Sequence, residues 1–107
     1  MLLLADGRFP AGGHAYSAGT ESAVRYGDVT DLASLERYLR GRLATLGATD
    51  AAFAARACAA VADPALLDVL DAEYAARTPS PRARAVSRQL GRQLLRAART
   101  VWPHPAL

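Results

Sequence analysis

The chain has 107 residues, a length that fits one domain or a fragment of one. Hydrophobic residues make up 51% of it, and many of them are alanine, which favours closely packed helices over a thick aromatic core. The single cysteine excludes an intramolecular disulfide. The opening run Met1–Ala5 lacks the basic residues and the length of a signal peptide or membrane span, so we expect a cytoplasmic protein with no membrane partner.

Charge is unevenly distributed along the chain. The formal net charge is +3, and all 13 basic residues are arginine. Residues 1–77 contain seven of these arginines and all 10 acidic residues, whereas residues 78–107 contain six arginines and no acid. The C-terminal part is therefore a cationic element on a mildly acidic body.

The first third of the chain predicts two short helices around a loop. Leu2–Phe9 forms an apolar helix that stops at Pro10, because the residue before proline is pushed out of the α region. Residues 10–13 form a loop. Helix resumes at Ser17 or Ala18 and ends at Tyr26, with Gly27 as the residue that terminates it.

The clearest amphipathic helix is predicted at residues 32–46, with Asp31 as its N-cap and Gly47 after its last turn. Its buried face consists of leucines that recur at steps of three and four, namely Leu32, Leu35, Leu39, Leu43 and Leu46.

The next helix opens at Thr49 or Asp50 and breaks at Asp63-Pro64. Its alanine-rich sequence includes Cys58, which we expect to be a small buried thiol.

Asp63 as N-cap and Pro64 in the first turn restart the helix. The buried face of this helix consists of Leu66, Leu67, Leu70 and Tyr74.

Residues 78–81 form a hinge in which Ser80-Pro81 repeats the N-cap pattern, and the last helix covers residues 82–100. No strand-like alternation occurs, so the predicted fold is all-α, with five to six short helices packed as an irregular bundle.

His14 and Ser17 lie close together in the sequence, and Asp6 or Glu21 would complete a Ser/His/acid trio of the kind that enzymes use. Nothing in the sequence sets their geometry, and no G-x-S-x-G elbow or H-E-x-x-H helix is present. A small hydrolase is therefore only a third hypothesis, and we expect no catalytic residues.

Phosphate and metal sites are predicted to be absent as well. A P-loop requires a preceding strand and a lysine after its glycines, and Gly12-Gly13 has neither. His14, His104 and Cys58 have no ligand spacing, so we expect no metal ligands.

The last helix carries an arginine row at four-residue steps, Arg84, Arg88, Arg92 and Arg96. Three interpretations stay open: a docking face for an acidic protein, a solvated face paired with acids of the preceding helix (Asp68, Asp71 and Glu73), and a nucleic-acid contact. Nucleic acid is the weakest of the three, because only Gln89 and Gln93 resemble base-reading residues. Gly91 in mid-helix suggests that another backbone passes close, or that one poor helix former is tolerated.

Two segments of the sequence resemble the UreF family of urease accessory proteins. The first is Leu3-Leu4-Ala5-Asp6-x-x-Phe9-Pro10-x-Gly12-Gly13-His14-x-x-Ser17-x-Gly19-x-Glu21, which is similar to the family's N-terminal signature. The second, Ala85-x-Ser87-Arg88-Gln89-Leu90-Gly91-Arg92-Gln93-Leu94-Leu95-Arg96, is similar to a later helix of the family. Family members are longer, so residues 1–107 correspond to a single N-terminal portion, half of a larger all-helical domain.

The resemblance implies a non-enzymatic scaffold that bridges UreD (also called UreH) and the GTPase UreG, so that nickel is inserted into apo-urease. It implies no cofactor bound by the chain itself, because nickel is handled by the wider complex. A homodimer is a further possibility. The competing hypothesis is a basic helical nucleic-acid-binding module.

The motif residues are the candidate site residues, and each has a packing role as an alternative to partner binding. Ser17 is expected to cap a helix with Glu21 near its first turn, and we expect His14 and Tyr16 to touch a partner. Arg88 and Arg92 are placed to meet a carboxylate on a neighbouring helix or on a partner. The full set is Phe9, Pro10, Gly12, Gly13, His14, Tyr16, Ser17, Gly19, Glu21, Arg88, Gly91 and Arg92.

Overall fold

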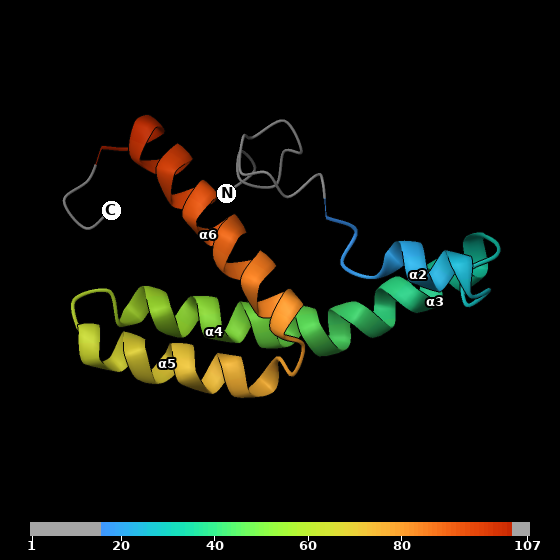
Figure 1. Cartoon of the computed structure of the whole chain (residues 1–107), viewed down its shortest axis with the longest axis horizontal. Coiled ribbons are helices and arrows are strands. Elements are labelled where there is room, and N and C mark those ends of the chain that lie inside the picture. Colours follow the sequence, from blue (N-terminus) through green and yellow to red (C-terminus); the bar gives the residue numbers. More distant parts are fainter. Residues whose placement is uncertain (1–15, 104–107) are drawn as a thin grey trace. The chain divides into compact units, whose positions relative to one another are not determined.

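A computed structural model describes residues 16–103, and every regular element in that range is a helix (Figure 1). This confirms the predicted all-α class. In chain order the elements are α2 (Thr20–Arg25), α3 (Leu32–Arg42), the π-helical turn η2 (Leu43–Gly47), α4 (Ala48–Ala59), α5 (Pro64–Arg77) and α6 (Pro81–Val101). The predicted helix Leu2–Phe9 and loop 10–13 lie outside the described residues.

The described residues belong to two compact units. The first contains residues 17–60, with α2, α3, η2 and α4, and the second contains Tyr16 and residues 61–103, with α5 and α6. None of the helices in the described range is long and apolar enough to cross a membrane.

In the first unit, α2 ends in a Schellman motif. Gly27 has a left-handed φ of 84°, as its predicted role requires. The amide of Asp28 donates to the Ala23 carbonyl at 2.9 Å, and the amide of Gly27 donates to the Val24 carbonyl at 3.2 Å. Two carbonyls that the helix end would leave unpaired are thereby satisfied.

The next helix, α3, begins seven residues after the end of α2 with a reciprocal cap, as the prediction of Asp31 as N-cap requires. The Asp31 carboxylate accepts from the Ser34 amide at 2.7 Å, and Ser34 Oγ accepts from the Asp31 amide at 3.0 Å. The same hydroxyl accepts from the Thr30 amide at 3.0 Å. The Ser34 hydroxyl also donates to the Asp31 carboxylate at 2.6 Å. This bond, followed by the one from the Ser34 amide, holds the pKa of Asp31 below its usual value.

This corner between α2 and α3 contains three of the five buried residues in the described range: Ala23, Val29 and Ser34. Val29 also donates its amide to the Ala23 carbonyl at 3.2 Å. Paired backbone hydrogen-bonding groups and buried apolar side chains therefore occur at the same place. The corner is the part of the unit that these interactions constrain most.

The prediction that a helix ends at Gly47 and another starts at Thr49 or Asp50 is wrong. Gly47 has φ −60° and ψ −42°, so α3, η2 and α4 form one continuous helical run. A terminating glycine needs positive φ, and Gly47 does not adopt it. The junction is marked instead by the π-helical turn, within which Thr45 Oγ1 donates to the Gly41 carbonyl at 2.8 Å.

The leucine stripe of residues 32–46 is not buried as predicted. Leu32 is 80% exposed and Leu43 is 70% exposed, while Leu35 is half-buried. The spacing correctly places the leucines on a helix, but the described residues do not cover that face. Cys58 on α4 is exposed as well, which corrects its predicted burial.

In the second unit, α5 begins as predicted, since the Asp63 carboxylate accepts from the Leu66 amide at 3.1 Å and Pro64 occupies the first turn. Leu70 is the only buried residue on the predicted apolar face, where Leu66 is exposed. Leu67 and Tyr74 on that face are half-buried.

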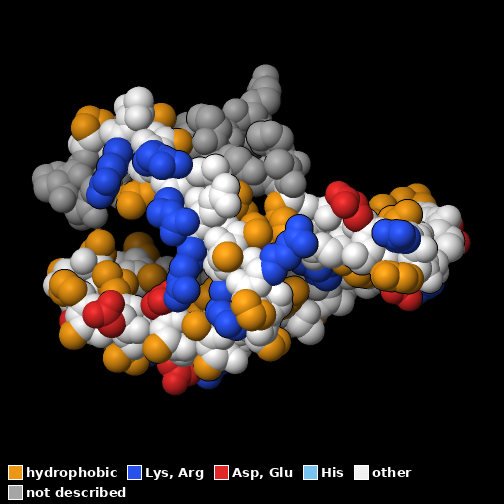
Figure 2. All heavy atoms as spheres, in the orientation of Figure 1, with side chains coloured by type: hydrophobic (Ala, Val, Ile, Leu, Met, Phe, Trp, Pro, Cys, Tyr) orange, Lys and Arg blue, Asp and Glu red, His pale blue; other side chains and the backbone are white. Residues whose placement is uncertain are grey.

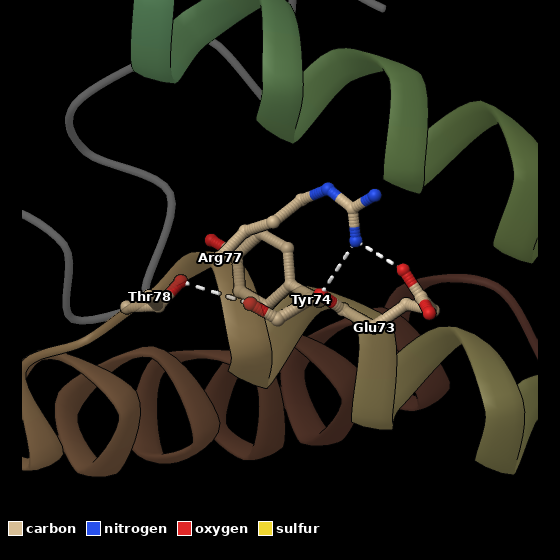
Figure 3. A network of polar contacts seen from close by, with 4 residues as sticks. All are labelled: Glu73, Tyr74, Arg77 and Thr78. Carbon is tan, nitrogen blue, oxygen red and sulfur yellow. Dashed lines mark hydrogen bonds and ion pairs between the residues drawn. The ribbon is translucent and has the colours of Figure 1, made fainter.

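Side chains satisfy the last carbonyls of α5 (Figure 3). Arg77 donates to the Glu73 carbonyl at 3.0 Å and pairs with the Glu73 carboxylate. Thr78 Oγ1 donates to the Tyr74 carbonyl at 3.1 Å. A basic side chain in the last turn also suits the negative end of the helix dipole.

The short turn after Thr78 leads into α6, which extends one residue beyond the predicted range at each end. Ser80 Oγ accepts from the Ala83 amide at 3.2 Å, which confirms Ser80 as N-cap. The turn is further fixed by Arg84, which donates to the Thr78 carbonyl at 2.6 Å and to the Pro79 carbonyl at 3.0 Å.

We expect Gly27→Ala to destabilise the first unit by about 1–2 kcal/mol, because an L-residue is strained at φ 84° even though no heavy atom lies within 4 Å of the new Cβ. Gly41→Ala is the matched control: it lies inside α3 with equally open space, so it should stabilise by about 0.5–1 kcal/mol. Urea unfolding followed by circular dichroism measures both. Equal effects of the two substitutions would contradict the assigned backbone strain.

The first turn of α3 should loosen in acid. Because the folded-state pKa of Asp31 lies below its unfolded value, its contribution is present above about pH 4 and disappears as the pH falls through the lowered pKa. The Cα chemical shifts of residues 32–35 report this change. Asp31→Asn keeps a good N-cap without a titrating group, so its shifts should stay constant over the same range.

Candidate functional site

The described part of the signature segment forms a tight left-handed turn before α2. Ala18 has φ 53° and Gly19 has φ 94°, and the Thr20 amide donates to the Ser17 carbonyl at 3.1 Å. The helix therefore starts at Thr20, with Gly19 as N-cap and no side-chain cap. The prediction of Ser17 as N-cap is wrong, because its carbonyl and not its hydroxyl closes the turn.

A pair of residues on α3 holds this turn. Arg42 Nη1 donates to the Ala18 carbonyl at 2.5 Å and to the Tyr38 hydroxyl at 3.1 Å. The Arg42 guanidinium lies over the Tyr38 ring, 5.6 Å from its centroid, and both residues are half-buried. We call Arg42 and Tyr38 the clamp.

The clamp was missed by sequence reasoning because it acts across 24 residues. The only local signal was the four-residue spacing of Tyr38 and Arg42, which places the two on one helix face. A Cβ on Gly19 would lie 3.8 Å from both clamp side chains, so glycine is required there by its φ of 94° and not by lack of space.

The other signature residues divide into described and undescribed ones. Glu21 lies in the first turn of α2, as predicted, and is exposed. Tyr16 is 42% exposed. The remaining predicted residues, Phe9, Pro10, Gly12, Gly13 and His14, lie outside the described residues.

The second candidate surface is the arginine row of α6, visible as a line of blue side chains along that helix (Figure 2). Arg84 holds the turn before α6, and Arg88 pairs with Asp71 of α5 at 2.7 Å. For Arg92 and Arg96, which are exposed, the residues between 16 and 103 supply no ion-pair partner. Among the described residues, the inner half of the row (Arg84 and Arg88) makes contacts within the unit, and the outer half (Arg92 and Arg96) makes no ion pair.

Gly91 lies in the outer half of this row. Within the described range, no atom lies within 4 Å of a Cβ built at Gly91. The predicted close approach of another backbone is therefore not made by the described residues.

The described residues contain no cluster of three or more His, Cys, Asp or Glu side chains that would hold a metal ion.

Comparison with known proteins gives a consistent result. The family profile described as UreF matches residues 29–107. The chain belongs to the UreF family. It is 50% identical over 103 residues to the urease accessory protein UreF of Mycolicibacterium vanbaalenii, covering 96% of this chain and 48% of the relative. The corresponding proteins of Mycobacterium tuberculosis and Mycobacterium marinum are 47% and 46% identical, with 96% of this chain and 47% of each relative covered. No solved structure matches the chain.

The chain therefore spans about half the length of these UreF relatives. The profile match includes Arg88, Gly91 and Arg92, whereas the signature residues of the turn precede it. The pairwise matches cover 96% of the chain and so include residues 8–21 as well.

The ion pair between Arg88 and Asp71 should contribute little to stability, because both side chains are more than half exposed. A double-mutant cycle of Arg88→Ala and Asp71→Ala should give a coupling free energy of about 0.2–1 kcal/mol, measured by urea unfolding. The coupling should shrink as salt is added. A larger, salt-independent coupling would contradict a surface pair.

Proposed function

We propose that the chain acts as the N-terminal portion of a urease accessory scaffold that bridges the UreD (UreH) and UreG homologues during nickel insertion into apo-urease. The observation that carries this proposal is the UreF family match over residues 29–107, together with relatives that are named urease accessory proteins. In this role the chain binds proteins without catalysing a reaction, and nickel is handled by the wider assembly in the cytoplasm.

The surface chemistry of the described residues supports a protein-binding role. Large apolar side chains are exposed on both units, including Leu32 and Leu43 on the first and Val101 and Trp102 on the second. Exposed apolar surface of this kind marks protein contacts. Residues 1–107 are then one portion of a larger helical domain, and the undescribed His14 and the half-exposed Tyr16 are proposed partner contacts.

The arginine row gives the exposed surface of α6 a positive charge. Arg92 and Arg96 are exposed and have no ion-pair partner among the described residues, so an acidic partner face would complement them. The same charge is what a nucleic-acid-binding module would use. The use of Arg84 and Arg88 inside the unit leaves less of the row for phosphate contacts, which favours the protein partner.

Copurification tests the proposal directly. The chain, expressed with UreD and UreG homologues, should be retained with them, and the double variant Arg92→Ala/Arg96→Ala should be retained less. Its helix content should not change, because these arginines make no ion pair within the described residues. The matched control Arg37→Ala removes an exposed arginine from α3 and should leave retention unchanged.

If the chain retained neither the UreD homologue nor the UreG homologue, the scaffold proposal would be overturned. Binding of arbitrary duplex DNA with a steep salt dependence, lost in the Arg92/Arg96 variant, would favour the nucleic-acid alternative. A chimera gives a functional readout: the chain replaces the matching half of the Mycobacterium tuberculosis relative in a strain that lacks UreF, and urease activity should be restored.

A further inference from the structure

The turn at Ser17–Gly19 needs an external support. Ala18 occupies a left-handed conformation that costs an L-residue roughly 1 kcal/mol, and Gly19 follows it in the same region. The helix that the turn starts, α2, has only six residues and no side-chain N-cap. A helix this short is not stable by itself, and the contacts that fix α2 are at its C-terminal end, away from the turn.

The clamp supplies that support from α3. The Arg42 guanidinium, which lies over the Tyr38 ring at 5.6 Å from its centroid, donates to the carbonyl of the strained residue Ala18 itself. A hydrogen bond from a charged donor is stronger than one between neutral groups, and a half-buried site screens it less than a surface site does.

A neighbouring arginine shows that this contact is specific to one position. Arg40, two residues before Arg42, donates to the Glu36 carboxylate at 2.8 and 2.9 Å on an exposed face of the same helix. That pair stays within one helix and reaches no other segment. Removal of Arg40 therefore changes charge and helix composition as removal of Arg42 does, but leaves the turn untouched.

We propose that Arg42 is a positioning residue for partner binding: with Tyr38 it holds the turn 17–19 and so limits the conformations of Tyr16, the described partner contact proposed above. This rests on the proposed function above. Tyr16 is joined directly to the turn, so an ordered turn lowers the conformational entropy that this contact residue loses on binding. Arg42 itself need not touch the partner.

Two readouts on the chain test the inference. The first is amide hydrogen exchange at Thr20 and Ala23, whose amides donate to Ser17 and Gly19 across the turn. The second is the dissociation constant for the UreD and UreG homologues. Arg42→Ala should accelerate exchange and weaken binding about tenfold, the size expected for losing a charge-assisted hydrogen bond. Arg40→Ala should leave both within about twofold.

Conservative variants separate positioning from bulk stability. Arg42→Lys keeps a donor for the Ala18 carbonyl and should recover part of the affinity. Tyr38→Phe keeps the ring under the guanidinium and loses only the hydroxyl bond, so it should lower the affinity less than Arg42→Ala does. Arg42 acts through the turn 17–19, which is joined to Tyr16. Tyr16→Ala should therefore cost less affinity in the Arg42→Ala background than in the wild-type chain.

The outcomes are distinguishable. If the wild-type chain binds and Arg42→Ala binds equally well, the positioning role is overturned while the proposed function stands, even where exchange is faster. Additive effects of Tyr16→Ala and Arg42→Ala would also overturn it. If the wild-type chain binds neither homologue, the proposed function and this inference fail together.

Discussion

The first unit depends on the hydroxyl of Ser34, the only buried polar side chain in the described range. Ser34 Oγ accepts from the Thr30 and Asp31 amides while its own amide is held by the Asp31 carboxylate. An unpaired polar group in that position would cost the full desolvation penalty, so the corner between α2 and α3 has one satisfactory geometry. That geometry sets where α3 begins, and Arg42, eight positions after Ser34 on the same helix, reaches the signature turn from there.

Local rules predicted the helix starts and failed where tertiary context decides. Asp31, Asp63 and Ser80 were identified as N-caps because the chemistry of a cap lies within three residues, and each side chain accepts from the amide three residues later. Gly47 shows the limit of this approach: glycine permits a helix stop without requiring it, and here it stays helical. Ser17 shows another limit, since the following Ala18 and Gly19 enter the left-handed region and shift the helix start to Thr20.

Burial was less predictable than helicity. The leucine spacing at residues 32–46 correctly predicts a helix and an apolar face, but spacing cannot say which segment covers that face. Leu32 and Leu43 remain largely exposed. The candidate site shows the same division: the pairing of Arg88 with an acid of the preceding helix could be anticipated from two helices joined by a short turn. The contact of Arg42 with Ala18 could not, because it depends on how a turn 24 residues away is folded.

The two candidate surfaces use arginine in different ways, and this difference has a consequence for recognition. Arg42 is half-buried between a ring and a carbonyl, so its contribution is a fixed geometry that salt weakens little. Arg92 and Arg96 are exposed on a helix without acids, so they contribute long-range attraction that salt screens. At α6, attraction of an acidic partner would make the association rate depend on ionic strength. At the turn, an ordered geometry would act on the residence time of a partner, since shape and desolvation govern dissociation more than long-range charge does.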